Sequence, residues 1–473
     1  GSGKTEVYLR AVADALEKGG QALVLVPEIN LTPQLEARFA ARFPGRVLVS
    51  QHSRLTPAQR LRHWVQAHTG QADIVLGTRL AVFASLPRLA IVVVDEEHDA
   101  SFKQQEGARY SARDLAVYRG HLEGVPVLLG SATPSLESLV NVEAGRYRLL
   151  RLPQRAGAAQ PPSLHVMDVR KKRLEHGLAL ITLDRISEVL ARGEQVLVFR
   201  NRRGYAPVLI CQACGWSAQC SRCDRPMTLH RGAARLRCHH CAAEQRVPAA
   251  CPQCTMSTLA PQGQGTERIE ETLRERFADI PILRVDRDST RNRSSRDAVF
   301  EQLHGDGARI LVGTQMLAKG HDLPGLTLVV VVGVDEGLHS IDFRAGERLG
   351  QLIVQVAGRA GRADRAGSVI LQTHHPDHPL LRALIEGGYP ALARGLIAER
   401  RAAALPPFAH LALLRDDGDA VEILRSAVVL LDLVADHGTA HGADDGAGRA
   451  ARAAADLASD HGADRSAEQG AAA

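Results

Sequence analysis

Hydrophobic positions in this chain fall in short continuous runs separated by longer stretches of mixed polar and apolar residues. Such runs occur at 22–26, 74–76, 91–94 and 127–129, and again at 195–199, 282–285, 310–312, 326–332 and 368–372. Each run has the length of a strand, and the stretches between them leave room for helices. Runs without polar alternation are typical of strands buried on both faces of a parallel sheet. The pattern therefore predicts an α/β fold with two regions of β-α-β units.

The predicted organisation has five parts. Residues 1–150 form a first lobe, 151–207 a linker and the start of a second lobe, 208–260 a cysteine-rich insertion, and 261–408 the rest of the second lobe. The linker is indicated by prolines at 153, 161 and 162. In the Ala-rich last part, 409–473, we expect helix to about Val434 and little order after it.

Length and composition narrow the class of protein. The chain has 473 residues, of which 45% are hydrophobic, so it can build several cores. Its longest apolar runs are far shorter than the ~20 residues of a membrane-spanning helix, and no signal segment opens it. We therefore expect a cytoplasmic protein without a membrane partner. The absence of an initiating Met leads us to expect a segment of a longer protein.

The charge balance says little about partners. The formal net charge is +5. If eight cysteine thiolates bind two zinc ions, the balance falls to about +1. Binding to a polyanion would then depend on local patches of positive charge.

Four short motifs in a fixed order carry the candidate chemistry: GSGKT at 1–5, DEEH at 95–98, GSAT at 130–133 and QVAGRAGR at 355–362. The first is the end of a phosphate-binding loop, whose backbone N–H groups surround phosphates. The start of that loop would lie before residue 1. Each motif alone has an alternative interpretation: GSGKT could be a tag remnant, DEEH a solvated acidic turn, and the Gly-Arg motif a basic loop. The four motifs in this order favour an ATP site between two lobes.

Each motif predicts a role. We expect Lys4 to contact the β- and γ-phosphates and Thr5 to bind Mg²⁺. Asp95 and Glu96 directly follow a buried run, which places them at the carboxyl end of a strand, where ligands bind in α/β sheets. Asp95 is expected to hold Mg²⁺, and Glu96 to orient and deprotonate the attacking water. His98 either couples this site to Gln355 or to the Ser-Ala-Thr run, or caps a helix.

The opposite wall of the site is predicted to come from the second lobe. There, Arg359 and Arg362 would stabilise charge on the γ-phosphoryl transition state. The expected catalytic residues are Lys4, Asp95, Glu96, Arg359 and Arg362, and the expected nucleotide-binding residues are Gly1, Ser2, Gly3, Lys4, Thr5, Gln355, Gly320 and Asp322.

All eight cysteines occur in Cys-x-x-Cys pairs: Cys211/Cys214, Cys220/Cys223, Cys238/Cys241 and Cys251/Cys254. Such a turn directs two sulfurs at one metal, and two turns complete a tetrahedral zinc site. The four pairs can combine in three ways. The 14-residue spacer between the inner pairs is close to zinc-ribbon length, which favours the inner couple for one zinc and the outer couple for the other. Disulfides are the alternative, disfavoured in a reducing compartment. We expect two structural Zn²⁺.

Further motifs give the chain a resemblance to a known family. VPE at 26–28, GTR at 77–79, KQQEG at 103–107, NRRGY at 201–205 and GTE at 265–267 accompany the motifs above. Together with four Cys-x-x-Cys pairs between two motor lobes, they resemble the PriA replication-restart helicases (primosomal protein N′) of superfamily 2 over roughly residues 1–408. The resemblance implies two RecA-like lobes with a two-zinc module inserted in the second, and it implies the nested zinc pairing.

The resemblance also implies an activity and partners. These are ATP-dependent 3′-to-5′ unwinding of forked and single-stranded DNA, primosome assembly and loading of the replicative helicase. Implied protein partners are single-strand-binding protein, primosomal proteins and the replicative helicase with its loader, in the bacterial cytoplasm at the nucleoid. In the family, DNA-binding domains precede this part and a carboxy-terminal domain follows it. Two other functions stay open: a non-catalytic scaffold that holds DNA or a loader, and a translocase without strand separation.

The same resemblance implies contacts to DNA. Arg79 and Thr314 stand where the lobes of the family touch the DNA backbone. In the loop after the acidic box, Phe102 and Tyr110 would stack on bases while Lys103 and Arg109 meet phosphates. The alternative for this segment is an ordinary surface loop with one buried aromatic residue.

Overall fold

The computed structural model describes residues 3–27, 33–105, 107–152, 161–200, 209–222, 227–230, 235–238, 243–261, 266–285, 307–313, 323, 325–340, 342–361 and 367–411. Two compact units are present, Gly1–Ile397 and Ala398–Ala473, and all the sheets belong to the first. Within the described ranges, no helix is both long and apolar enough to span a membrane. The predicted helix before Val434 lies outside the described residues.

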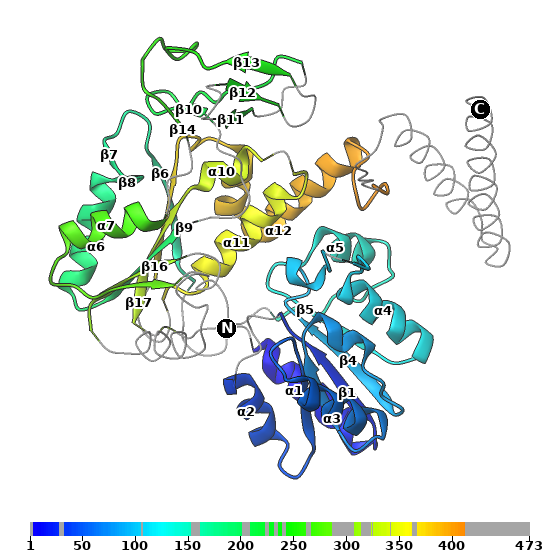
Figure 1. The fold of residues 1–473 in the computed structure, drawn as a ribbon. Helices are drawn as coiled ribbons and strands as arrows, with labels where there is room; N and C mark the ends of the chain where they lie inside the picture. Colours follow the sequence, from blue (N-terminus) through cyan, green and yellow to red (C-terminus); the bar gives the residue numbers. More distant parts are fainter. Residues whose placement is uncertain are drawn as a thin grey trace, which may run out of the picture. The chain divides into compact units, whose positions relative to one another are not determined.

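The first lobe is built on a parallel sheet that has, among the described residues, five strands in the order β2-β3-β1-β4-β5. Figure 1 labels β1, β4 and β5 of this sheet. The strands are β1 (Gln21–Leu25), β2 (Leu48–Gln51), β3 (Ile74–Gly77), β4 (Leu89–Asp95) and β5 (Val127–Gly130). Four of them coincide with predicted runs. The strand β2 was not predicted, because only alternate residues in it are buried.

Helices cover both faces of this sheet. They are α1 (Lys4–Glu17), α2 (Pro33–Arg42), α3 (Pro57–His68), α4 (Ala112–Glu123) and α5 (Leu136–Glu143), with the short 3-10 helices η1 (Arg79–Phe83) and η2 (Ala100–Phe102). Successive strand residues enter opposite cores: Leu23 and Val92 pack in a cluster with residues of α3 and α4, whereas Val24 and Val93 pack with residues of α1 and α2. Each fully buried aliphatic side chain stabilises the fold by about 1.5–3 kcal/mol. The carboxyl edge of the sheet is thereby held between two packed layers.

The second lobe has a parallel sheet in the order β15-β16-β9-β17-β18-β6. Its strands are β6 (Ser163–Asp168), β9 (Gln195–Arg200), β15 (Ile282–Val285), β16 (Arg309–Gly313), β17 (Leu326–Val332) and β18 (Ser368–Thr373). Its helices are α6 (Leu180–Ala191), α7 (Thr266–Arg276), α10 (Val334–Leu338), α11 (Ala345–Ala357) and α12 (Pro379–Ala402), beside the hairpin β7 (Leu174–Glu175) and β8 (Leu178–Ala179). The edge strand β6 is half-buried and begins directly after the linker prolines, so its sequence shows no apolar run.

The cysteine-rich insertion lies between β9 and α7. It contains the antiparallel pair β10 (Leu209–Cys211) and β14 (Leu259–Pro261), and an antiparallel sheet of β11 (Thr228–His230), β12 (Arg235–Arg237) and β13 (Glu244–Arg246). Its buried cluster is small: Leu209, Ala218, Cys220, Met227, Leu236 and Cys238. A core of this size needs additional stabilisation such as bound metal.

Candidate nucleotide and metal sites

The phosphate-loop lysine lies beside both predicted acidic residues. The helix α1 begins at Lys4, and Gly3 before it has φ 81°, in the left-handed region that favours glycine. Lys4 Nζ is 2.6 Å from Glu96 Oε1 and 4.0 Å from Asp95 Oδ1. Thr5 lies in the first turn of the same helix. The N-terminus of a helix and an ammonium group both attract negative charge, so together they suit an anionic phosphate. Gly1 and Ser2 lie outside the described residues.

Asp95, the last residue of β4, is held by a tyrosine that the sequence did not single out. Tyr8 OH donates to Asp95 Oδ1 at 3.0 Å. Its oxygen lies 1.5 Å from where a Cβ at Gly130 would stand, so the residue paired with Asp95 in β5 must be glycine. Burial, followed by the charge of Glu96, raises the pKa of Asp95 to about 6, and Lys4 acts in the opposite direction. A divalent cation at this carboxylate would favour its charged form.

Glu96 is held in an unusual backbone conformation. Its φ is 49°, which is uncommon for a residue with a side chain. Its Oε2 atom is buried and accepts no hydrogen bond from the described residues. That oxygen lies 3.6 Å from His98 Nδ1. A buried acceptor without a partner is suited to receive a hydrogen bond from a water molecule.

His98 connects three of the predicted motifs. Gln355 Nε2 is 2.5 Å from His98 Nε2, and His98 Nδ1 is 2.7 Å from Ser131 Oγ. Since the amide donates to Nε2, the ring proton lies on Nδ1, which donates to the serine. The sequence analysis offered contact with Gln355, contact with the Ser-Ala-Thr run, or helix capping for His98. In the structure His98 contacts both Gln355 and the Ser-Ala-Thr run. The helix-capping role belongs to its neighbour Asp99, which caps η2.

One face of α11 contacts the segment that follows the Ser-Ala-Thr run. Glu347, Gln351 and Gln355 are four residues apart, so they share that face. Glu347 Oε1 accepts from Leu136 N at 3.0 Å, and Gln351 Nε2 lies 3.5 Å from Thr133 O. Only Gln355 was predicted. The signal for the other two is the spacing of polar residues by four in a helix that is otherwise largely apolar.

A buried carboxylate fixes the same segment from the first lobe. Glu97 is 2% exposed and accepts from Ser135 N at 2.7 Å, Ser135 Oγ at 3.0 Å and Ser138 Oγ at 3.1 Å. Arg113 Nη1 lies 3.3 Å away as its ion-pair partner. Ser135 caps the N-terminus of α5. Glu97 therefore determines where α5 begins, and this role was not predicted from the sequence.

The remaining predicted residues of the second lobe are only partly described. Arg359 follows the end of α11, four positions after Gln355, and its backbone N–H is bonded to Val356 O at 3.0 Å. Gly320, Asp322 and Arg362 lie outside the described residues, as does Thr314. The roles of all five remain predictions.

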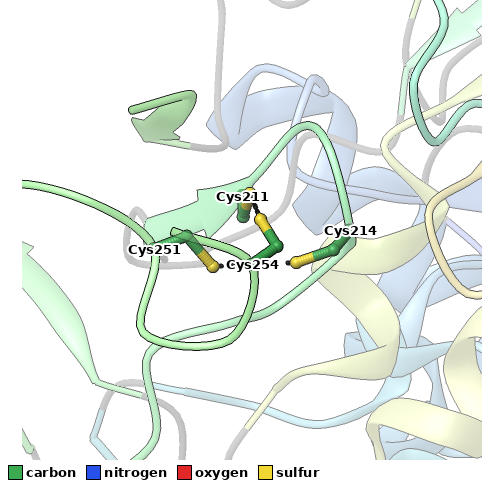
Figure 2. Close-up of side chains that lie close together, drawn as sticks. All are labelled: Cys211, Cys214, Cys251 and Cys254. Atoms are coloured by element: carbon green, nitrogen blue, oxygen red, sulfur yellow. Dashed lines mark hydrogen bonds between the residues drawn. The ribbon is translucent and has the colours of Figure 1, made fainter. Parts of the chain in front are cut away.

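Four cysteines from two distant turns form one cluster (Figure 2). The sulfurs of Cys211, Cys214, Cys251 and Cys254 all lie within 4.8 Å of one another. Cys211 Sγ and Cys254 Sγ are 3.6 Å apart, as are Cys214 Sγ and Cys251 Sγ. A zinc tetrahedron with bonds of about 2.3 Å has edges of about 3.8 Å, whereas a disulfide is about 2.05 Å long. The donor set fits zinc, and it is the predicted outer couple.

The surroundings of the cluster shift the pKa values of its thiols in both directions. Burial acts to raise the pKa of Cys211, but hydrogen bonds from Thr258 and backbone N–H groups lower it to about 6. Burial and hydrogen bonds to its neighbours raise the pKa of Cys214 to about 12. Several thiolates this close repel each other, and a bound cation removes that repulsion. The inner couple is partly described: Cys220 and Cys238 are buried, whereas Cys223 and Cys241 lie outside the described residues.

The predicted DNA-contacting residues of the first lobe cluster at the carboxyl edge of its sheet. Arg79 Nη1 donates to Ser101 O at 3.2 Å. Lys103 Nζ donates to Arg109 O at 3.1 Å and so closes the loop that leads to the partly buried Tyr110. Phe102 differs from our expectation, because it is 2% exposed and packs in the lobe core. Its ring offers no face to a base here, and the alternative of one buried aromatic residue describes it better.

Known proteins match the chain along its length. Residues 1–142 match the DEAD/DEAH box helicase family, 262–364 the helicase conserved C-terminal domain, and 220–246 the PriA DNA helicase Cys-rich region (CRR) domain. Replication restart protein PriA of Haemophilus influenzae is 49% identical over 415 residues, which cover 88% of this chain and 57% of that relative. The same protein of Rickettsia felis is 37% identical over 435 residues, covering 90% of this chain and 67% of the relative.

The chain belongs to the PriA family of replication restart proteins. It spans between about half and two thirds of the length of the curated relatives it matches, including the Bacillus subtilis protein, which is 39% identical and covered to 53%. Among solved structures it is similar to RecG bound to a three-way DNA junction, with a TM-score of 0.47, 16% identity, and coverage of 91% of this chain and 46% of that one. Membership of the family and the two parallel sheets confirm the predicted fold class of two RecA-like lobes with a cysteine-rich insertion.

Proposed function

We propose that the chain is the motor of an ATP-dependent 3′-to-5′ DNA helicase of replication restart, which unwinds stalled forks and promotes primosome assembly and loading of the replicative helicase. One observation carries the proposal. A run of side-chain contacts from Lys4 through Glu96 and His98 to Gln355 connects the phosphate loop of the first lobe to the arginine motif of the second. Coupling between hydrolysis and lobe movement requires such a connection.

Hydrolysis is assigned to the residues around Asp95. Lys4 binds the β- and γ-phosphates, and its ammonium group leaves the Glu96 carboxylate when it does so. Glu96, through its unpaired Oε2, orients the attacking water and takes its proton. Thr5 and Asp95 would hold Mg²⁺, which when bound neutralises charge on the phosphate oxygens. Arg359 and Arg362 stabilise the charge that develops on the transferred group, while Gly1, Ser2, Gly3, Gln355, Gly320 and Asp322 complete the nucleotide contacts.

DNA binding is assigned to the other half of the same sheet edge. Arg79, Lys103 and Arg109 provide positive charge for the phosphates of a single strand, with Thr314 on the second lobe. Tyr110 lies between these groups and the lobe core. Because the acidic box leads directly into this loop, strand binding can be communicated to Glu96.

We assign the cysteine-rich insertion a structural role with two zinc ions, one on Cys211, Cys214, Cys251 and Cys254 and one on Cys220, Cys223, Cys238 and Cys241. Its fold depends on metal because its own core is small. By analogy with the family, we propose single-strand-binding protein, primosomal proteins and the replicative helicase with its loader as partners. The proposed location is the bacterial cytoplasm at the nucleoid.

Measurement of DNA-stimulated ATP hydrolysis tests the proposal. The parent chain should hydrolyse ATP faster with single-stranded DNA, and Lys4→Ala should lower the rate by at least about 100-fold while DNA binding persists. Glu96→Gln, which keeps the shape of the side chain, is the matched inactive control. Turnover of the parent no higher than that of Glu96→Gln would favour the scaffold function, and hydrolysis without strand separation would favour a translocase.

A further inference from the structure

A small polar hollow lies where β2, β3 and β4 end in the first lobe. Ser53, Thr78, Arg79, Leu80 and Ser101 line it, and its volume is about 30 Å³. Three of these side chains carry hydroxyl groups, and one carries a guanidinium. Such a lining is rich in hydrogen-bond donors and has a fixed positive charge, which suits the oxygens of one phosphate group.

One hydroxyl of the lining has no partner. Ser101 Oγ is buried and forms no hydrogen bond with the described residues. Buried polar groups are normally paired, so an unpaired hydroxyl in a hollow indicates a place for a ligand oxygen. The neighbouring Arg79 is held in position by the bond from its Nη1 to the backbone oxygen of the same serine.

An exposed aromatic ring ends the short helix whose first residues line this hollow. Phe83 ends η1, the short helix that begins at Arg79. Its side chain is 59% exposed, and its ring contacts Tyr110 edge-on, with centroids 5.0 Å apart and planes at 75°. Burial raises the pKa of Tyr110, while the positive charge of Arg79 acts against that rise. Phe83 and Tyr110 therefore form one aromatic pair, and Arg79 begins the helix that carries Phe83.

We propose that Phe83 is a stacking platform for one nucleobase of a single strand, whose neighbouring phosphate lies in the hollow against Arg79, Thr78 and Ser101. This proposal rests on the proposed function and adds to it a residue and a mode of contact outside the loop at 103–110. Stacking uses the face of a base, which every base has, so the contact is independent of sequence. Phe83 thus takes the base-stacking role that the sequence analysis expected of Phe102, whose ring is buried.

The test is equilibrium binding of the full chain to a fluorescently labelled oligothymidine, measured by anisotropy without nucleotide. Phe83→Ala should weaken binding by about 5- to 100-fold, and Phe83→Trp should retain the affinity of the parent. The new tryptophan should lose fluorescence when the oligonucleotide binds, because its ring is stacked. Tyr118→Ala is the matched control: Tyr118 is also 59% exposed but belongs to α4 and not to η1, and its loss should leave binding unchanged.

A second arm separates the base from the phosphate. On an oligonucleotide made entirely of abasic sites, the parent and Phe83→Ala should bind with the same low affinity, because no base is left to stack. Arg79→Ala should bind this oligonucleotide more weakly than the parent does, because it has lost a phosphate contact. Equal affinity of Phe83→Ala and the parent for oligothymidine, or a Phe83→Trp signal that DNA does not change, overturns the platform and leaves the proposed function intact. If the parent binds no single strand at all, the proposed function fails, and the platform fails with it.

Discussion

Two regions of the molecule are held together in opposite ways. The contact between α11 and the segment 133–136 consists of buried polar groups that share partners, such as Glu347 Oε1, which accepts from both Leu136 N and Gln351 Nε2. The cysteine-rich insertion instead has short strands, a small apolar cluster and a set of four sulfurs. A polar contact of the first kind can separate and re-form as a motor works, because its groups can exchange partners. A zinc site is closed on all sides and gives a fixed shape.

The largest expected effect comes from the insertion. Cys211→Ser removes one of four sulfurs, so we expect loss of about one zinc equivalent and of the local fold, measured by metal analysis of the purified chain. ATP hydrolysis should change by less than about threefold, since no cysteine of this cluster contacts the Lys4–Glu96 site. Met256→Ala, which removes an exposed side chain beside the turn of Cys251 and Cys254, should keep its zinc. Full zinc content in Cys211→Ser would contradict the assignment of this cluster.

The next effect concerns Glu97. Glu97→Ala leaves the backbone N–H of Ser135 buried without its acceptor, while Arg113 keeps Asp114 and Ser135 Oγ as partners, so the free energy of unfolding should fall by about 1–3 kcal/mol in a urea titration. Glu123→Ala removes the exposed partner of Arg119 and should cost no more than about 1 kcal/mol. Equal losses in the two variants would show that the buried carboxylate does not organise α5.

A smaller effect is expected at the contact between the lobes. Gln355→Ala removes one hydrogen bond to His98, which is worth about 0.5–1.5 kcal/mol. The DNA-stimulated ATPase rate should therefore fall by about 2- to 13-fold, with little change in the affinity of the chain for single-stranded DNA. Zinc content should stay the same. An unchanged degree of stimulation by DNA would remove His98 from the path between the lobes.

The last effect is small near neutral pH and concerns the surface of the second lobe beside the insertion. The position of a Cβ at Gly215 lies 2.9 Å from His374 O, so the two parts approach closely there. Burial, and then the neighbouring His375, lowers the pKa of His339 to about 4, and their Nε2 atoms are 2.8 Å apart. Because the folded pKa lies below the unfolded value of about 6.5, the unfolded chain binds more protons between these values.

Stability should therefore be complete above about pH 6.5 and decline as the pH falls toward 4, by at most about 1.4 kcal/mol per pH unit for this group. Urea titrations of the parent and of His339→Asn at several pH values measure the slope. The variant should show a shallower decline over this window. Parallel slopes would mean that His339 does not contribute.

The sequence predicted the sheets well and the contacts between distant segments poorly. Strands that are buried on both faces have continuous apolar sequences, so β1, β4 and β17 were predicted. The half-buried β2 and β6 lack such runs and were not predicted. Motif order placed Lys4, Asp95 and Glu96 correctly beside one another. The bond from Leu136 to Glu347 joins residues 211 positions apart, and neither carries a local signal for the other. Phe102 was expected to stack on a base but is buried in the lobe core, because sequence spacing alone does not show which aromatic ring of a loop packs inward.

Gly130 illustrates how far one missing side chain reaches. The Tyr8 hydroxyl occupies the volume that any larger residue at 130 would need, and it is this hydroxyl that steadies Asp95. A side chain at position 130 would displace this hydroxyl, and a residue without a hydroxyl at position 8 would leave Asp95 without this bond. The choice at position 130 therefore limits what position 8 can do for Asp95, so redesign of this sheet edge has to consider both.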